Sequence, residues 1–400
     1  MSRWQDCLLN ELCIISSGES LPAIEQRGPF PLMGANGQIG NASKTNFSKG
    51  FLVGRVGAAG EVSTISFPCW ASDNTLTIKT KTKAVSMEFL AHALRNLNLA
   101  SIATKTAQPL LTQSQLKKQL LHLPENTREQ ERIAEILDTL DTQIQKTEAL
   151  IAKLEKIKEG LLHDLLTQGI DQNGQLRPTP EQAPELYKDS ALGLIPKEWA
   201  ISNLQKSCSE IIDCPHSTPD FRDYGVLVAR TSNIKGGVFE AANASKVSEK
   251  EYLHRIARLE PKAGDLILTR EAPVGEAFVI PTGMKICLGQ RVMLLRPDRN
   301  KMLGEFLLAQ IYSGKLRDRI QILTAGTTNP HLNVSEVSFF TVPIPELSEQ
   351  KAILRRVMAL EIRLAKEKKK SIKTTKIKNG LMDDLLTGHV RVTALLNEAV

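Results

Sequence analysis

The sequence predicts an α/β protein in which two globular mixed α/β domains are joined by two long antiparallel coiled-coil helices with a pseudo-twofold internal repeat. Three observations carry this prediction: the length of 400 residues, a long segment that occurs twice at an offset of 220, and a heptad pattern of apolar residues within that segment. A chain of this length usually exceeds what one hydrophobic core serves. The composition, 42% hydrophobic and 24% charged, excludes disorder as the main state.

The first domain is expected over residues 1–125. Asn36-Gly37 is a tight-turn signal, and short β-type runs follow at Phe51–Val53 and Thr75–Ile78. The glycines at 34, 37 and 40 superficially suggest a nucleotide-binding loop. They are not followed by Lys-Ser/Thr and do not have the G-x-G-x-x-G spacing, so a phosphate site is not favoured.

A long helix is predicted over residues 126–168. Thr127-x-x-Gln130 has the form of a capping box, and the helix ends where Leu-Leu-Thr is followed within two residues by glycine. Thirty-nine residues at 1.5 Å each give a rod of roughly 58 Å, which is typical of a coiled coil. The apolar residues at heptad spacing are Ile133, Leu137, Leu140, Ile144, Ile151, Leu154, Leu161 and Leu165.

The second half of the chain repeats the first. At an offset of 220, 15 of the 39 positions from Glu129 to Thr167 are identical, far above chance. Weaker pairs precede this segment in the same order along the chain: Trp4 with Trp199, Asn36 with Asn233, Arg55 with Arg270, Gly60-Glu61 with Gly275-Glu276, and Gln108 with Asn329. This order predicts a duplication with insertions.

The repeat also sets the remaining boundaries. Residues 169–198 are rich in Gly, Pro, Gln and acidic residues and are interpreted as a linker. The second domain is expected over 199–345, with about 18 extra residues between Asn233 and Arg270, a strand–turn–strand over 264–276, and a helix from about Met302 to Ile320. The second long helix is expected over 346–390, followed by a tail over 391–400.

The net charge of +7 is unevenly distributed between the two long helices. Residues 128–166 carry a net charge of −3, whereas 349–391 carry +7 because of the lysines between 366 and 378. Opposite charge favours antiparallel pairing of the two helices within the chain. Two alternatives stay open: each helix docks onto a partner chain, or the lysines contact DNA phosphates.

Motifs of chemistry are scarce. There is no P-loop, helicase box, nucleophile elbow or amino-methyltransferase motif, and Cys214-Pro215-His216 lacks a second ligand pair for zinc, so we expect no metal site. Asp220 with Glu260-x-Lys262 leaves open an unrecognised nuclease site. Six cysteines without a C-x-x-C pair and no apolar stretch of membrane-spanning length predict a cytoplasmic, non-membrane protein.

Several strings taken together resemble the specificity subunits of type I restriction-modification systems. They are Pro124-Glu125 followed by Glu129-Gln130-x-x-Ile133-Ala134, Pro343-x-Pro345 followed by Glu349-Gln350-x-x-Ile353, Gly160-Leu161-Leu162-x-Asp164-Leu165-Leu166-x-x-Gly169-Ile170, Gly193–Trp199, and Gly264-Asp265-Leu266. Their order, with a Glu-Gln helix after each proline segment, covers nearly the whole chain.

The resemblance implies a function. Each globular half would be a target-recognition domain that reads one part of a split, asymmetric site on double-stranded DNA, and the helices would fix the gap. It also implies two methyltransferase subunits and translocating nuclease subunits as partners. The chain itself would be non-catalytic and hold no cofactor; S-adenosylmethionine, ATP and magnesium would bind to the partners.

Candidate base-reading residues are polar side chains on loops, because arginine pairs with guanine and asparagine or glutamine with adenine. The alternative for each is an ordinary turn or strand-end residue, and the alternatives for the whole chain are a coiled-coil scaffold without DNA readout or an enzyme with an unrecognised nuclease site. The candidates are Asn36, Gln38, Lys44, Arg55, Lys105, Gln108, Arg230, Thr231, Asn233, Lys235, Arg270, Thr328, Asn329 and His331.

Overall fold

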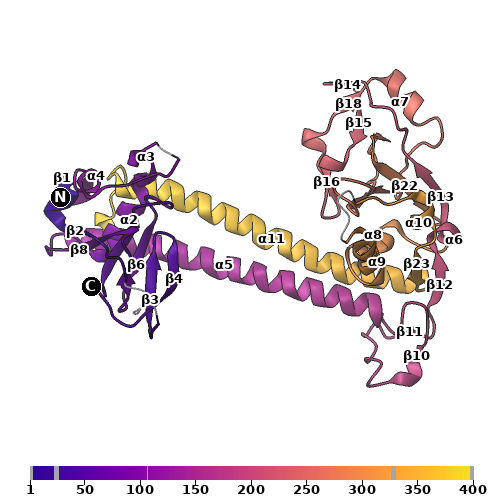
Figure 1. Cartoon of the computed structure of the whole chain (residues 1–400), viewed down its shortest axis with the longest axis horizontal. Helices are drawn as coiled ribbons and strands as arrows, with labels where there is room; N and C mark the ends of the chain where they lie inside the picture. The colour runs from indigo at the N-terminus through magenta and orange to yellow at the C-terminus, as the bar shows by residue number, and fades with distance from the viewer. Residues whose placement is uncertain (1–2, 22–26, 106, 326–329, 397–400) are drawn as a thin grey trace. The chain divides into compact units, whose positions relative to one another are not determined.

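The structure is a computed structural model that describes residues 3–21, 27–105, 107–325 and 330–396. The chain forms two compact units: unit 1 comprises Met1–Leu150 and Glu367–Val400, and unit 2 comprises Ile151–Lys366. Figure 1 shows one globular α/β domain in each unit, together with parts of the same two long helices. The predicted fold class, two mixed α/β domains joined by two long paired helices, is confirmed.

The domain of unit 1 is built on a four-stranded antiparallel sheet in the order β2-β8-β5-β6. Its core holds Phe51, Ile78, Phe89 and Leu94, all almost completely buried. Helix α2 begins after Ser86, whose hydroxyl accepts a hydrogen bond from Phe89 N. The elements are β2 Cys13–Ser17, β5 Gly50–Gly54, β6 Val62–Ile65, β8 Thr75–Thr80, α2 Met87–Asn96, α3 Leu99–Ile102 and α4 Gln113–Lys117.

A smaller three-stranded sheet, β4-β3-β7, carries the predicted Asn-Gly turn. Strands β3 (Phe30–Gly34) and β4 (Gly37–Ala42) pair antiparallel, and Gly34 lies opposite Gly37, so the turn consists of Ala35 and Asn36. Gly37 has a φ of 100°, which glycine adopts without a steric penalty. The third strand, β7, spans Trp70–Ala71.

A separate strand pair closes the domain and leads into the first long helix. Strand β1 (Trp4–Leu8) pairs antiparallel with β9 (Leu120–Pro124), and helix α1 (Leu9–Leu12) follows β1 directly. The chain then turns into α5 (Thr127–Thr167), a helix of 41 residues.

Unit 2 repeats this arrangement. Its main sheet has the order β13-β22-β19-β20, equivalent strand by strand to that of unit 1, and the pair β12–β23 is equivalent to β1–β9. The internal repeat is thus confirmed in the tertiary structure. The elements are β12 Ala200–Asn203, α6 Leu204–Ser207, β13 Cys208–Asp213, β19 Leu266–Thr269, β20 Ala277–Val279, β22 Val292–Pro297, α10 Val334–Ser338, β23 Thr341–Ile344 and α11 Leu347–Leu386.

The second sheet of this domain has the order β14-β18-β15-β21, in which β15 pairs antiparallel with β18 and parallel with β21, as β3 pairs with β4 and β7 in unit 1. A short hairpin, β16–β17, packs next to β20 of the main sheet. The elements are β14 Phe221–Arg222, β15 Val226–Ala229, β16 Ile234–Lys235, β17 Val238–Phe239, β18 Lys246–Val247, α7 Glu249–Arg255 and β21 Ile286–Leu288.

The single helix predicted from about Met302 to Ile320 is wrong. The structure has two helices, α8 (Gly304–Tyr312) and α9 (Lys315–Thr324). They are separated at Ser313-Gly314, where Gly314 has a φ of 77° that ends the first helix.

The segment interpreted as a linker is folded. Strands β10 (Tyr187–Lys188) and β11 (Ile195–Pro196) pair antiparallel, and Ile170, Ile195 and Trp199 are buried in the core of unit 2. A polar, glycine-rich composition concealed these few apolar anchors, which are too widely spaced to form a periodic pattern.

The expected capping box at the start of α5 is also wrong. Asn126 precedes the helix, and its Oδ1 accepts a hydrogen bond from Arg128 N at 3.0 Å. The buried Gln130 amide turns to the domain instead, donating to Ala84 O and Pro124 O and accepting from Ser86 N. Gln350 does the same in unit 2, donating to Lys301 O and Pro345 O and accepting from Leu303 N. Each glutamine therefore fastens its long helix to its own domain.

Helices α5 and α11 pack together with repeat-related contacts. In unit 1, Lys378 Nζ lies 2.6 Å from Asp141 Oδ1, and in unit 2, Lys158 Nζ lies 2.6 Å from Glu361 Oε1. The four residues occupy equivalent positions of the two copies, since 158 and 141 are each 220 below 378 and 361. These pairs agree with the expected pairing of oppositely charged helices.

The predicted helix stops are confirmed at Gly169 and Gly388, which have φ values of 68° and 75°. A Cβ on Gly169 would lie 2.5 Å from the Trp199 ring, and one on Gly388 would lie 3.0 Å from the Trp4 ring. Glycine is required at both places by the backbone angle and by the close approach of a tryptophan.

Candidate nucleic-acid interface

Four of the six candidate residues of the first domain lie on segments that come together at the end of β5. Arg55 follows β5, and its carbonyl accepts a hydrogen bond from Leu111 N at 2.9 Å. This bond brings the loop over 104–110, which carries Lys105 and Gln108, against the strand end. The Asn36 turn reaches the same place, because a Cβ on Gly54 would lie 3.0 Å from Ala35 O.

Most of these side chains face solvent. Arg55 is half-buried, and its guanidinium lies 3.4 Å from Asp73 O. The Gln38 amide donates to Gly40 O and Asn41 Oδ1 within its own hairpin. The exposed candidates of this domain are Asn36, Gln38, Lys44, Lys105 and Gln108.

The second domain has the same backbone hydrogen bonds around the corresponding strand end, and we call this repeated set of bonds the loop frame. Thr269 N bonds to Glu276 O as Gly54 N bonds to Glu61 O, and Leu332 N bonds to Arg270 O as Leu111 N bonds to Arg55 O. Arg55 and Arg270 are therefore structurally equivalent. The candidates Thr328 and Asn329 lie outside the described residues.

Arg270 itself is not displayed on the surface. It is only 7% exposed, its Nε donates to Leu332 O at 2.8 Å, and its guanidinium pairs with Asp213 Oδ1 at 2.5 Å. A guanidinium held in this way is occupied inside the domain. In this structure Arg270 thus holds the loop that contains His331, and a base contact of Arg270 stays a prediction.

His331 lies within an ionic network around Arg270. Its Nε2 is 3.0 Å from an Arg270 nitrogen and its Nδ1 is 2.8 Å from Glu271 Oε1. His331 Nε2 also lies 3.0 Å from Asn333 Oδ1, and because Arg270 can only donate and a carboxamide oxygen can only accept, Nε2 can serve only one of these two contacts at a time. Glu271 also pairs with Arg291, whose Nε is 3.4 Å from Oε2.

The other candidates of the second domain lie after β15. Arg230 is exposed, stacks over the Phe221 ring at 4.9 Å and bonds to Ser245 Oγ. Thr231 is half-buried and Lys235 is exposed at the β16–β17 turn. Asn233 is buried, with its amide directed to Asn243 O, so its side chain serves the fold in this structure.

Sequence reasoning missed Arg291. Its side chain is 59% exposed, it neighbours Arg270 through a backbone bond from Arg270 N to Arg291 O, and its φ is 64°. A positive φ is rare for a side chain of this kind and often marks a functional loop. In the sequence, only the position of Arg291 after Gly289-Gln290 indicates a turn, and this signal is too weak to mark Arg291 as a candidate residue.

A second missed feature is the pair of exposed aromatic side chains around β14. Tyr224 is 69% exposed and Phe221 is exposed beneath the Arg230 guanidinium. Aromatic rings next to arginine are surfaces on which bases can stack. No periodic pattern surrounds these residues, so the sequence did not indicate them.

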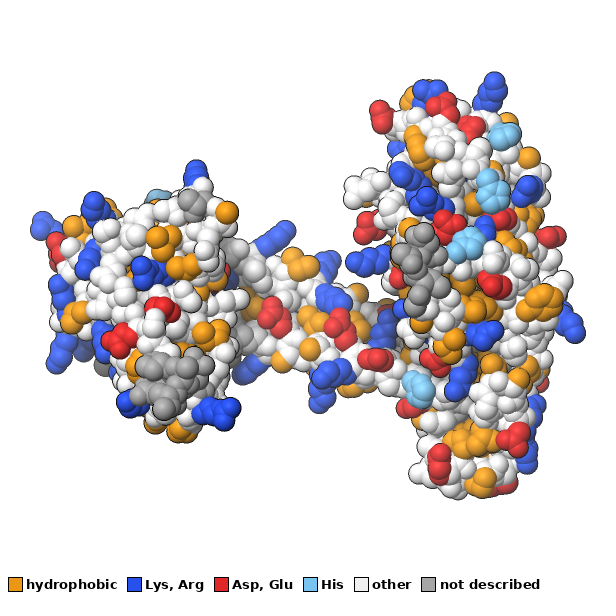
Figure 2. All heavy atoms as spheres, in the orientation of Figure 1, with side chains coloured by type: hydrophobic (Ala, Val, Ile, Leu, Met, Phe, Trp, Pro, Cys, Tyr) orange, Lys and Arg blue, Asp and Glu red, His pale blue; other side chains and the backbone are white. Residues whose placement is uncertain are grey.

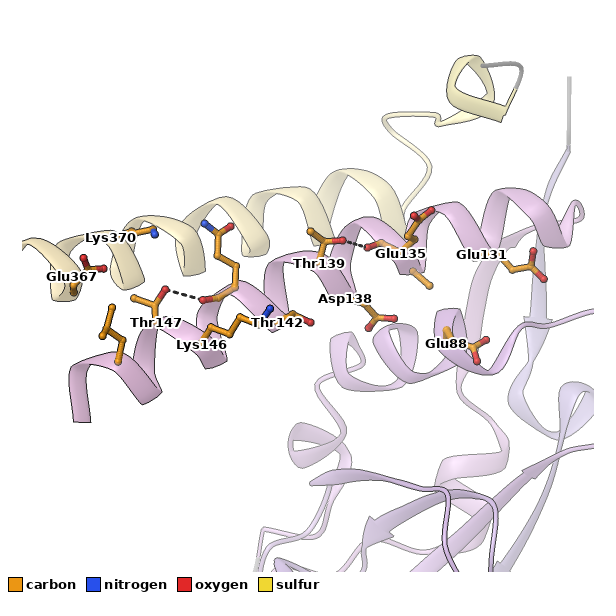
Figure 3. A pocket seen from close by; sticks show the side chains of 13 residues that line it. Glu88, Glu131, Glu135, Asp138, Thr139, Thr142, Lys146, Thr147, Glu367 and Lys370 are labelled. Atoms are coloured by element: carbon orange, nitrogen blue, oxygen red, sulfur yellow. Dashed lines mark hydrogen bonds between the residues drawn. The ribbon is translucent and has the colours of Figure 1, made fainter. Parts of the chain in front are cut away.

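The charge of the domains is mild, as the sequence indicated. On the face drawn in Figure 2, Lys and Arg side chains are spread over both units among acidic ones. In the described part of the chain, one group of possible metal ligands stands out, His92, Asp138 and Asp141. His92 Nε2 bonds to Asp138, which Figure 3 shows on α5, at 2.8 Å, and Asp141 pairs with Lys378, whereas His92 Nδ1 is buried without a hydrogen-bond partner among the described residues.

The fold and the repeated backbone hydrogen bonds define a protein of two equivalent α/β domains that present corresponding loops. The family model described as type I restriction modification DNA specificity domain matches residues 1–156 and 216–374. These ranges make up most of the chain, which therefore belongs to this family.

Curated relatives carry the corresponding names. The chain is 26% identical over 283 residues to the type I restriction enzyme MjaVIII specificity subunit of Methanocaldococcus jannaschii, covering 67% of this chain and 61% of that protein. It is 24% identical over 330 residues to the EcoBI specificity subunit of Escherichia coli, covering 78% of this chain and 67% of that protein.

Solved structures share the fold over nearly the whole length. The crystal structure of a type I restriction-modification S subunit from M. genitalium covers 96% of both chains at a TM-score of 0.62 and 17% identity. A chain from a study of complex assembly and conformational transition of the type I R-M system covers 97% of this chain and 98% of its own at a TM-score of 0.55 and 16% identity. Among the described residues, no helix combines the length and apolarity needed to span a membrane.

Proposed function

We propose that the chain directs a type I restriction-modification complex to DNA, with each globular domain reading one part of a bipartite, asymmetric site and the paired helices setting the spacer. The observation that carries the proposal is the loop frame, which recurs at Arg55 and Arg270. The two domains therefore hold equivalent loops, but the side chains on these loops differ. Two readers with unlike loops suit a site whose two parts differ in sequence.

The helices suit the role of a ruler. Helices of 41 and 40 residues correspond to rods of roughly 60 Å, and two readers on one face of B-DNA must be separated by about one turn, roughly 34 Å, or a multiple of it. Cross-helix ion pairs and a buried seam make such a rod stiff. A stiff rod would give a spacer of fixed length.

The catalytic parts are assigned to partners. Two methyltransferase subunits and translocating nuclease subunits would dock on the chain and carry S-adenosylmethionine, ATP and magnesium. The polar loops described above would contact bases, while exposed lysines such as Lys44 and Lys105 would neutralise phosphates and make binding depend on salt.

Modification-sensitive sequencing of host DNA tests the proposal. We expect a bipartite motif methylated on adenine, which disappears when the gene for this chain is deleted. A continuous palindromic motif, or a motif that survives the deletion, would count against it.

Lengthening the helices tests the ruler. The ion pairs place position 153 of α5 opposite about position 366 of α11, since the numbers of both pairs sum to the same value. Seven residues inserted at both places keep the pairing and add roughly 10 Å, about three base pairs. We expect both half-sites unchanged and a longer gap. A heptad in α5 alone should disturb the pairing and alter or abolish methylation; an unchanged gap in both variants would reject the ruler.

The alternatives have their own readouts. A scaffold without DNA readout would leave duplex DNA unshifted by the chain with its methyltransferase partner. A nuclease would cleave DNA with magnesium when the chain is alone. The residues suggested for that site are otherwise engaged: Asp220 pairs with Arg222 at 2.6 Å, and Glu260 accepts a hydrogen bond from the Tyr252 hydroxyl at 3.0 Å.

A further inference from the structure

One position next to the loop frame carries a polar side chain in both domains. In the second domain it is Arg291, whose carbonyl accepts a hydrogen bond from Arg270 N at 2.8 Å. In the first domain it is Asn74, whose carbonyl accepts a hydrogen bond from Arg55 N, also at 2.8 Å. Because Arg55 and Arg270 are equivalent, these two bonds make Asn74 the structural equivalent of Arg291.

Three more pairs of backbone contacts place Asn74 and Arg291 at the same point of the fold. In each domain the next residue opens the strand beside β5 or β19 and bonds to the end of the first strand of the main sheet, and the residue two before bonds to the second sheet. The contacts of the first domain are Thr75 opposite Gly54, Gly18 N to Thr75 O and Ser72 N to Met33 O. Those of the second domain are Val292 opposite Thr269, Cys214 N to Val292 O and Gly289 N to Ala229 O.

The side chain just before this position is held in both domains. Asp73 Oδ2 accepts a hydrogen bond from Ser20 Oγ at 2.6 Å. Gln290 Nε2 donates to His216 O at 2.7 Å. These bonds fix each turn without using the side chain that follows, so a ligand of that side chain would meet a backbone that is already ordered.

The two side chains at the position itself face solvent. The Asn74 carboxamide is exposed and makes no hydrogen bond to another described residue. Arg291 is 59% exposed, and its Nε lies 3.4 Å from Glu271 Oε2, which is too long for a strong hydrogen bond. Each domain therefore presents one polar side chain at an equivalent, rigid and exposed point beside its loop frame.

We propose that Asn74 and Arg291 are specificity-determining residues, with Asn74 reading an adenine in one half-site and Arg291 reading a guanine in the other; this inference rests on the proposed function. A carboxamide can donate to adenine N7 and accept from adenine N6, whereas a guanidinium can donate to both N7 and O6 of guanine. Exchanging the bases would bring two acceptors together at Asn74 and two donors together at Arg291. Each side chain therefore rejects the base that the other one reads.

A phosphate contact is disfavoured at Asn74. The carboxamide is neutral, so it would gain little from a phosphate. The exposed carboxylate of the neighbouring Asp73 would repel one. The edge of a base carries no net charge and suits this turn better. Because Arg291 occupies the equivalent point, we infer that it approaches the DNA in the same way.

The test uses the full chain in complex with its methyltransferase partner and a pool of duplexes that carry the methylated motif with one position changed in each. Sequencing of the bound and free fractions gives the preference at every position. Asn74→Ala should lower discrimination at one adenine roughly tenfold or more and leave the rest of the motif unchanged. Asn74→Arg should shift the preference at that position from adenine to guanine. Arg291→Asn should shift a guanine of the other half-site to adenine.

Asn96→Arg is the matched control, because it adds the same charge at an exposed asparagine at the end of α2. It should leave the base preferences of both half-sites unchanged. Circular dichroism checks that each variant is folded. If Asn74→Arg is unfolded, Asn74→Ala decides alone, since it only removes polar atoms from an exposed turn.

Three results would overturn the inference while the proposed function stands. They are an equal change of affinity for all duplexes in Asn74→Ala, an unchanged preference in Asn74→Arg, and effects of the Asn74 and Arg291 variants within the same half-site. A wild-type complex that prefers no duplex would overturn the proposed function, and this inference with it.

Discussion

Glu129 in the first turn of α5 and Arg391 beyond the end of α11 form a bidentate ion pair, with Nε–Oε1 at 2.7 Å and a second N–O distance of 2.9 Å, although 262 positions separate them. Glu349 and Arg177 form the equivalent pair in unit 2. Each pair joins the start of one long helix to the segment that follows the end of the other. The acid is completely buried at Glu129 and only 11% exposed at Glu349.

Removing Arg391 should therefore destabilise unit 1. In Arg391→Met the Glu129 carboxylate stays buried without its partner, and breaking a buried pair costs on the order of 3 kcal/mol. Urea unfolding followed by circular dichroism measures this loss. Arg391→Lys, which keeps the charge but not the two-point geometry, should lie between the variant and the wild type. Two truncated chains are the controls: one ends after Leu396 and keeps Arg391, and the other ends after Val390 and lacks it. If both truncations lower the free energy of unfolding equally, a specific role of Arg391 is contradicted.

The two buried glutamines, Gln130 and Gln350, should contribute equally to the stability of the chain. Gln130→Leu leaves Ser86 N, Ala84 O and Pro124 O without this partner, and Gln350→Leu does the same to Leu303 N, Lys301 O and Pro345 O. Each should lower the free energy of unfolding by about 2 kcal/mol or more. Gln143→Ala, at an exposed position of α5, is the control and should change stability by less than about 0.5 kcal/mol. Equal effects at all three positions would argue against the anchoring role.

Substitutions of Arg291 and of Arg270 should have different effects on stability and on DNA binding. Arg291→Ala removes an exposed side chain, so it should leave stability nearly unchanged and cost on the order of 1–3 kcal/mol of binding at one base position. Arg270→Ala removes the guanidinium partner of the partly buried Asp213, so it should lower stability and weaken binding to every sequence alike. Binding to a pool of duplexes that differ at single positions of the motif measures both. A position-specific loss for Arg270→Ala would restore it as a base reader.

His92 should make unit 1 sensitive to acid. Burial lowers the pKa of His92, although Asp138 at 2.8 Å opposes this shift. The folded state then binds the proton less readily than the unfolded state, so this contribution to stability is present above the ordinary histidine pKa of about 6.5 and is lost as the pH falls below it. Thermal unfolding between pH 8 and pH 5 should show a smaller acid loss for His92→Gln. Asp138→Asn removes the opposing carboxylate and should show a larger loss; identical slopes for wild type and His92→Gln would contradict the prediction.

Much of the architecture followed from the sequence because it depends on local patterns. The heptads of α5, the glycines that end both helices, and the turn at Asn36 are each encoded within a few neighbouring residues. The same locality produced the errors. Gln130 looked like a capping residue because its partners Ala84 and Ser86 are more than forty positions away, and one helix was predicted over 302–320 because a glycine within an apolar run does not by itself predict a break.

The site was less predictable than the fold. The equivalence of Arg55 and Arg270 was found from their order in the repeat, and the backbone bonds to Leu111 and Leu332 confirm it. Which arginine reaches solvent was not encoded in that order. Arg270 turns inward because Asp213, on a different strand, offers a carboxylate, while Arg291 is carried outward by a backbone with positive φ.

The sequence by itself determined the duplication, the two long helices with their opposite charges, and the membership of the family that these features indicate, since all three are written as repeated patterns along the chain. Only the tertiary structure decided that each helix start is closed by an arginine from beyond the other helix and that Arg270 is buried. These depend on contacts between residues far apart in sequence, and burial turns such a contact from a weak surface interaction into a strong constraint.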